Sequence, residues 1–218
     1  MNVLHICANP KPAEESASKQ LSFAFLSKLI ELSPDAEVNN VDLYDDPPPY
    51  FSYEAFRSIW TPVYTPTYKP TAAETKAAAY ADRHAEMFNA ADVLVLTTPM
   101  WNFSLPAILK AWVDQVITPG RVFNFDTNEQ GVKISPRHKI QRVILLVSSG
   151  GSYSEGDERD ALTPAIRSVL SFVGITDITI AWADGQNPIN FGDHEERKQT
   201  ALDAAAEAAE DLVEDLGA

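Results

Sequence analysis

The segment Thr97-Thr98-Pro99-Met100-Trp101-Asn102-Phe103-Ser104-Leu105-Pro106 separates two different sequence patterns. Before it, residues 92–96 form a short apolar run with the length and branching of a buried strand. After it, apolar residues recur at helical spacing through residue 118. Because ligands bind at the carboxyl ends of strands in open α/β sheets, this segment is a candidate ligand loop. A helix entrance with aromatic side chains packed in the core is the alternative interpretation.

Strand and helix patterns alternate along the whole chain. The expected strands are residues 3–7, 38–43, 92–98, 142–148 and 177–182. The expected helices are residues 16–32, 72–89, 105–118, 163–173 and 193–216, and the last begins with Asp193 and Glu196 at capping-box spacing. Such alternation predicts an α/β fold, with a three-layer, doubly wound, parallel five-stranded sheet in the order 2-1-3-4-5.

Two segments lie outside this alternation, within what we expect to be one domain spanning residues 1–218. Residues 45–71 are rich in proline and aromatic side chains, which argues against a disordered linker. A long ordered excursion of this kind is often a lid or an interface. Within residues 119–137, the run Val122–Phe125 indicates a short extended piece.

The overall charge limits the classes of partner. Lys plus Arg number 17 and Asp plus Glu number 31, so the formal net charge is −14. An acidic chain gains nothing from counterion release on nucleic acid and is repelled by anionic lipid, so we expect no nucleic-acid and no membrane partner. Cys7 is the single cysteine, and residues 1–6 lack the basic region of a signal peptide. We therefore expect a cytoplasmic protein without an intrachain disulfide.

Two further loops have unusual composition and also follow predicted strands. The first, starting at Ala8 and Asn9, ends in Ser16-Ala17-Ser18 at a helix N-terminus, where hydroxyl and N–H groups can bind a phosphate. A simple N-cap is the alternative there. The second is Ser148-Ser149-Gly150-Gly151, whose glycines permit close approach of a ligand or merely form a flexible turn. Together the three loops predict a site for a planar, phosphate-bearing ligand.

Several of these motifs carry a family resemblance. They are Ser16-x-Ser18, Pro99-Met100-Trp101-Asn102-Phe103, Ser148-x-Gly150-Gly151 and Phe172-x-Gly174-Ile175-Thr176-Asp177. With them, nearly the whole chain resembles the FMN-dependent NADH:quinone oxidoreductase and azoreductase family, which has a flavodoxin-like fold. In that family Tyr is common where Trp101 stands, and Arg is frequent where Ser149 stands.

The resemblance implies a set of site residues. The expected FMN-binding residues are Asn9, Ser16, Ala17, Ser18, Pro99, Met100, Trp101, Asn102, Phe103, Ser148, Ser149, Gly150 and Gly151. Phe123, Phe125 and Phe172 fall where members place aromatics near the nicotinamide or substrate, and we expect Trp60 to wall the substrate pocket or meet a second subunit. No protein residue is expected to be catalytic and no metal is expected, since the flavin carries the chemistry. Members are homodimers with active sites at the interface.

The resulting functional hypothesis is an oxidoreductase. FMN accepts hydride from NADH or NADPH, and a quinone or azo compound then takes two electrons from the same place, in a ping-pong sequence. A flavodoxin-type electron carrier without direct NAD(P)H oxidation is the alternative, and the acidic surface fits it because such surfaces steer basic partners.

Overall fold

The computed structural model describes residues 1–128, 131–153 and 156–217. Its main sheet comprises β1 (Asn2–Cys7), β2 (Glu37–Asp42), β3 (Val93–Pro99), β6 (Arg142–Ser148) and β7 (Ile178–Ala183). Neighbouring strands all pair in parallel, in the order β2-β1-β3-β6-β7. This confirms the predicted doubly wound sheet and its 2-1-3-4-5 order.

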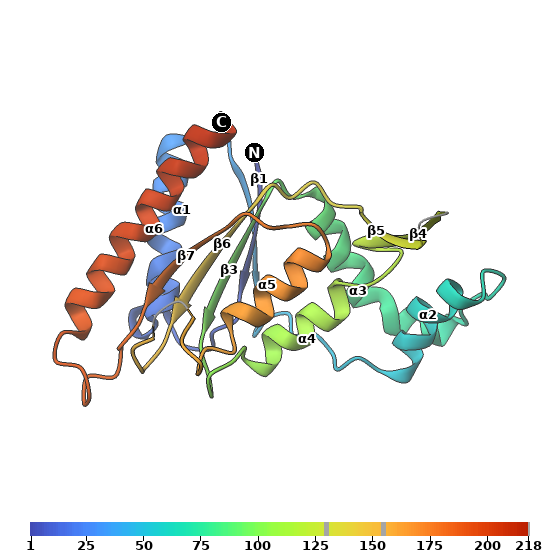
Figure 1. Cartoon of the computed structure of the whole chain (residues 1–218), viewed down its shortest axis with the longest axis horizontal. Helices are drawn as coiled ribbons and strands as arrows, with labels where there is room; N and C mark the ends of the chain where they lie inside the picture. The colour runs from blue at the N-terminus through green and yellow to red at the C-terminus, as the bar shows by residue number, and fades with distance from the viewer. Residues whose placement is uncertain (129–130, 154–155, 218) are drawn as a thin grey trace.

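Helices cover both faces of the sheet (Figure 1). One layer is α1 (Ala17–Leu32) with α6 (His194–Leu216), and the other is α3 (Ala72–Ala90), α4 (Ala107–Val116) and α5 (Thr163–Phe172). Successive side chains of β3 alternate between the two cores, because Leu94 faces α3 to α5 whereas Val95 faces α1 and α6. Burial on both faces explains why residues 93–96 of this strand are a continuous apolar run. Across the described ranges, no helix is long and apolar enough to cross a membrane.

The excursion at residues 45–71 contains α2 (Tyr53–Tyr64), a helix that was not predicted. Ser52 caps its start by accepting a hydrogen bond from the N–H of Ala55 at 3.1 Å. The Arg57 Nε atom lies 2.7 Å from Glu74 Oε1 on α3, which ties the excursion to the main body. Pro62 lies inside α2, and the helix still spans Tyr53–Tyr64.

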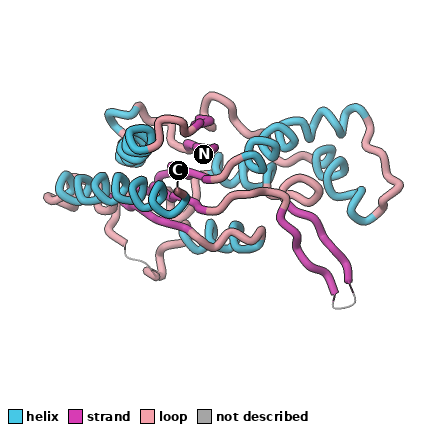
Figure 2. Tube along the Cα trace, turned by 90° about the horizontal axis from the view of Figure 1, so that it is seen from above, coloured by secondary structure: helices cyan, strands magenta, loops and turns pink. Residues whose placement is uncertain are grey.

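The extended piece predicted near Phe123 is confirmed as half of a hairpin. The strands β4 (Phe123–Asn128) and β5 (Gly131–Pro136) pair in antiparallel orientation, with Phe123 opposite Pro136. Figure 2 shows this hairpin projecting away from the main sheet.

The predicted capping box at the start of α6 is wrong. Asp193 is the N-cap, yet its side chain makes no cap hydrogen bond. Its carboxylate instead accepts a hydrogen bond from Arg197 Nε at 2.9 Å. A complete capping box is present at α3, where Thr71 and Glu74 each bond the other's backbone N–H.

Candidate functional site

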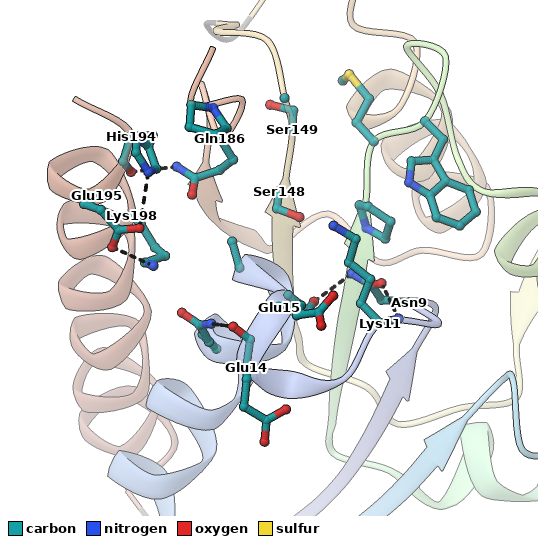
Figure 3. Close-up of a pocket in the computed structure, with 18 residues that line it drawn as sticks. Asn9, Lys11, Glu14, Glu15, Ser148, Ser149, Gln186, His194, Glu195 and Lys198 are labelled. Carbon is teal, nitrogen blue, oxygen red and sulfur yellow. Dashed lines mark hydrogen bonds and ion pairs between the residues drawn. The ribbon is translucent and has the colours of Figure 1, made fainter. Parts of the chain in front are cut away.

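A pocket of about 380 Å³ opens at the carboxyl ends of the sheet strands (Figure 3). The loops after β1, β3 and β6 all contribute to it, as the sequence predicted. The predicted cofactor residues among its lining are Asn9, Ser16, Ala17, Pro99, Met100, Trp101, Ser148, Ser149 and Gly150. Its volume lies within the usual range for sites that bind small molecules or cofactors.

The loop after β1 places a buried polar cluster at the start of α1. Asn9 Nδ2 donates to Ser16 Oγ at 2.7 Å and to Ser18 Oγ at 3.0 Å. Ser16 also caps the helix by accepting from the N–H of Lys19 at 3.2 Å. Apart from the 3.4 Å contact between the two oxygens, the described residues offer no acceptor for the two hydroxyl protons. The N-cap and the anion site are therefore compatible, since the Ser16 proton can still be donated to a ligand at the positive end of α1.

Residues 101–104 form a tight two-residue turn. The N–H of Trp101 donates to the carbonyl of Ser104, and the N–H of Ser104 donates to the carbonyl of Trp101, both at 3.0 Å. Asn102 and Phe103 have φ of 48° and 69°, the pattern of a type I′ turn. Left-handed backbone is uncommon for a bulky residue such as phenylalanine. The interpretation as a helix entrance with core aromatics is wrong here, because α4 begins at Ala107 and Trp101 is 42% exposed.

In the loop after β6, the hydroxyl of Ser149 is hydrogen-bonded within the protein. Ser149 Oγ accepts from Trp182 Nε1 at 2.8 Å and donates to the carbonyl of Gly151 at 2.8 Å. A Cβ atom on Gly151 would lie only 2.6 Å from the Tyr153 hydroxyl oxygen. The lack of a side chain at Gly151 therefore makes room for Tyr153 in this structure.

The fourth wall of the pocket comes from the segment after β7 and the first turns of α6, which the sequence analysis missed. This wall comprises Gln186, Pro188, His194, Glu195 and Lys198. The pocket is also lined by four residues near the start of α1 that were not predicted, which are Lys11, Glu14, Glu15 and Gln20. Figure 3 shows Gln186, His194 and Lys198 on the side opposite Lys11. Lys198 Nζ lies 2.7 Å from Glu195 Oε2, and this hydrogen bond holds the pKa of Glu195 below its usual value. The predicted sheet order could have indicated this wall, since β7 also ends at this edge of the sheet.

Some predicted residues lie outside the pocket lining. Ser18 is fully buried behind Asn9, while Asn102, Phe103 and Gly151 lie beside the pocket without lining it.

The four predicted substrate residues form a separate aromatic cluster. The Phe123 ring centroid lies 5.3 Å from that of Phe125 and 5.1 Å from that of Phe172, and Trp60 lies 6.4 Å from Phe125. Trp60, Phe123 and Phe172 line a second cavity of about 520 Å³. Within one chain, the structure does not bring them to the first pocket.

The first pocket fits FMN at both ends. The Ser16 hydroxyl, the first-turn N–H groups of α1 and Lys11 suit a phosphate, although Glu14 and Glu15 nearby oppose it. At the other end, the half-exposed Trp101 indole and the backbone of Gly150 form a flat wall suited to an aromatic ring.

Comparisons with known proteins agree with this geometry. Residues 1–212 match the family described as having a flavodoxin-like fold. A Beijerinckia indica protein named FMN-dependent NADH:quinone oxidoreductase is 32% identical over 85% of this chain and 88% of its own length. A Gluconobacter oxydans protein with the same name is 33% identical over 85% of this chain and 89% of its own length. The crystal structure of an azoreductase from Bacillus anthracis superposes with a TM-score of 0.83 and 30% identity, covering 95% of this chain and 98% of that one.

Proposed function

This chain belongs to the flavodoxin-like family that includes the FMN-dependent NADH:quinone oxidoreductases, and on that premise we propose that it is one such enzyme. It binds FMN and transfers two electrons from NADH or NADPH to a quinone or an azo compound. The observation that carries the proposal is one cavity with the Asn9–Ser16 cluster at one end and Trp101 at the other.

The protein's own residues bind and orient the cofactor. Ser16 donates its hydroxyl proton to the phosphate, and Asn9, which also bonds the buried Ser18, keeps the Ser16 oxygen in place. Trp101 and Met100 pack against the ring, and the type I′ turn holds Trp101 at the edge of the pocket. When bound, FMN supplies the hydride and electron transfer chemistry itself, which is why no catalytic side chain is required.

Donor and acceptor are proposed to bind in turn at the side of the pocket next to Trp101. Occupation of the same place by both would produce ping-pong kinetics. Trp101 is 42% exposed, so its indole is accessible to a planar molecule arriving from solvent.

The aromatic cluster is proposed to act across a homodimer interface. Several large apolar side chains on or near α2 and β4 are exposed, and Tyr50, Tyr53 and Tyr64 are exposed by 88%, 68% and 72%. Exposed apolar surface of this extent typically marks an interaction site. A second copy covering it could bring Trp60 and Phe125 to the first pocket of its partner. The cytoplasmic location remains a prediction, to be tested by cell fractionation.

An anaerobic stopped-flow experiment tests the function. Protein loaded with FMN is mixed with NADH or NADPH, and then with a quinone and with an azo dye. Rapid bleaching of flavin absorbance followed by recovery with either acceptor supports the enzyme. Slow NAD(P)H oxidation with an accumulating one-electron form would indicate the electron carrier instead, and failure to bind FMN would refute both.

A further inference from the structure

The loop after β6 is held along one edge by the segment after β7. The N–H groups of residues 185–187 donate to the carbonyls of Gly151, Ser149 and Gly150 at 2.9, 2.9 and 3.2 Å, in that order. Three consecutive carbonyl groups of the loop therefore all turn toward the same neighbouring segment.

The N–H groups of the same peptide units turn the other way. No peptide bond in the described part of the chain is cis, and in a trans peptide the N–H points opposite to the carbonyl. The N–H groups of Gly150, Gly151 and Ser152 thus point away from residues 185–187. Among the residues that the structure describes, none accepts a hydrogen bond from them, and Gly150 lines the cofactor pocket. A row of such donors is the arrangement that proteins use to bind negative charge.

A side-chain relay fixes the last of these peptide units. The Trp182 indole N–H can only donate, so at 2.8 Å it must donate to Ser149 Oγ. The Ser149 hydroxyl proton is then directed to the carbonyl of Gly151, also at 2.8 Å. Ser149 therefore presents no hydroxyl to the pocket, and Gly151 accepts from both Ser149 and Gly185.

Packing fixes the position of Trp182 in turn. Its ring stacks on Tyr153 with centroids 6.1 Å apart, and Tyr153 meets Phe103 edge-on at 6.3 Å. Trp182, the first donor of the relay, therefore lies in β7 and contacts the type I′ turn through Tyr153 and Phe103.

The hydrogen bond from Ser149 to the Gly151 carbonyl closes the loop across the two peptide units that carry the N–H groups of Gly150 and Gly151. We propose that Trp182 and Ser149 are positioning residues that, by closing this loop, hold those two N–H groups toward the ring of FMN. This inference rests on the proposed function. Reduced FMN carries more negative charge on its ring than oxidised FMN, so fixed N–H donors stabilise the reduced form more. The relay thereby sets the preference of the protein for reduced over oxidised FMN.

Three single variants test the proposal, together with the double variant that combines Ser149→Ala and Trp182→Phe. Ser149→Ala and Trp182→Phe each break the relay, whereas Ser149→Thr keeps the hydroxyl. Binding of oxidised FMN to the apoprotein is measured by fluorescence titration, and the two-electron midpoint potential by spectroelectrochemistry. In each relay-breaking variant, the preference for reduced over oxidised FMN should fall roughly tenfold. For a two-electron couple this corresponds to a midpoint potential lower by about 30 mV.

The pattern among the variants identifies the cause. The double variant should shift no further than either single one, because both interrupt the same chain of hydrogen bonds. Ser149→Thr should keep the parent potential. A parent-like potential in Ser149→Ala and in Trp182→Phe, even with a lower melting temperature, would reduce the relay to a structural anchor and overturn the proposal.

The two proposals fail in different ways. If the parent protein binds FMN and the variants leave its potential unchanged, only the relay is refuted. If the parent apoprotein does not bind FMN, the proposed function fails and the relay fails with it. Should Trp182→Phe not fold, Ser149→Ala and Ser149→Thr still decide the outcome.

Discussion

The side-chain amide of Asn9 donates to the Ser16 hydroxyl oxygen over 2.7 Å, beneath the first turn of α1. This contact joins the end of β1 to the N-cap of the helix that follows. Among the described residues, the Ser16 hydroxyl proton has only the 3.4 Å contact with the Ser18 oxygen as an acceptor, so it can be donated to a ligand.

Replacement of Asn9 should therefore weaken FMN binding. Asn9→Ala removes the donor shared by Ser16 and Ser18, so the Ser16 hydroxyl can rotate away from the phosphate. Loss of well-placed hydrogen bonds to a charged group predicts a dissociation constant roughly 10- to 100-fold higher, measured by fluorescence titration. Asn39→Ala, on exposed β2, is the matched control and should bind FMN as the parent does. Equal affinities for the two variants would contradict the assigned role.

The type I′ turn makes a prediction about stability. Asn102 has φ of 48°, which asparagine and glycine tolerate and β-branched residues do not. Asn102→Val should lower the free energy of unfolding by about 1–3 kcal/mol in urea titrations, and Asn102→Gly should stay close to the parent. If the valine variant were as stable as the glycine variant, the left-handed backbone at this residue would not be a real constraint.

Removal of the Trp60 side chain should change dimer assembly or turnover. Trp60 stacks with Phe56 and Tyr64 along α2 and meets Phe125 of the hairpin. Trp60→Ala should raise the dimer dissociation constant at least about tenfold, as expected for a large buried aromatic at an interface. Sedimentation velocity measures this, alongside kcat/KM for a quinone.

The exposed Phe23 provides the control for Trp60. It lies on α1, in the opposite helical layer, and is 74% exposed. Phe23→Ala should alter neither assembly nor kcat/KM. A Trp60→Ala variant that is equally unaffected would remove the proposed interface.

Sequence reasoning succeeded where local pattern and tertiary position agree. Residues 93–96 of β3 are all apolar because the strand is buried on both faces, so its place in the middle of the sheet could be predicted. α2 was missed because its aromatic side chains are half-exposed and a proline lies within it. The hydrogen bonds of Ser149 could not be predicted for a different reason, since its hydroxyl is oriented by Trp182, a residue distant in sequence.

The carboxylate of Glu74 predicts how stability depends on pH. It accepts hydrogen bonds from the N–H of Thr71 at 2.8 Å, from the Tyr68 hydroxyl, and from Arg57 Nε at 2.7 Å. These contacts, the backbone bond of Thr71 first, lower the pKa of Glu74 to about 2 from an ordinary value of 4.5. The unfolded chain therefore binds the proton first as pH falls. The stabilisation by Glu74 is complete above about pH 4.5 and is lost as the pH falls toward 2.

The corresponding experiment compares melting temperatures of the parent and Glu74→Gln at pH 7 and at pH 3. The parent should be more stable at pH 7, and the difference should shrink at pH 3, because at pH 3 the Glu74 carboxyl is largely protonated in the unfolded parent while it is still ionised beside Arg57 in the folded one. Glu86→Gln changes an exposed acid on the same helix and should show little difference at either pH. If the gap between parent and Glu74→Gln stayed constant with pH, the link from α2 to α3 would depend on shape and hydrogen bonding, not on the charge of Glu74.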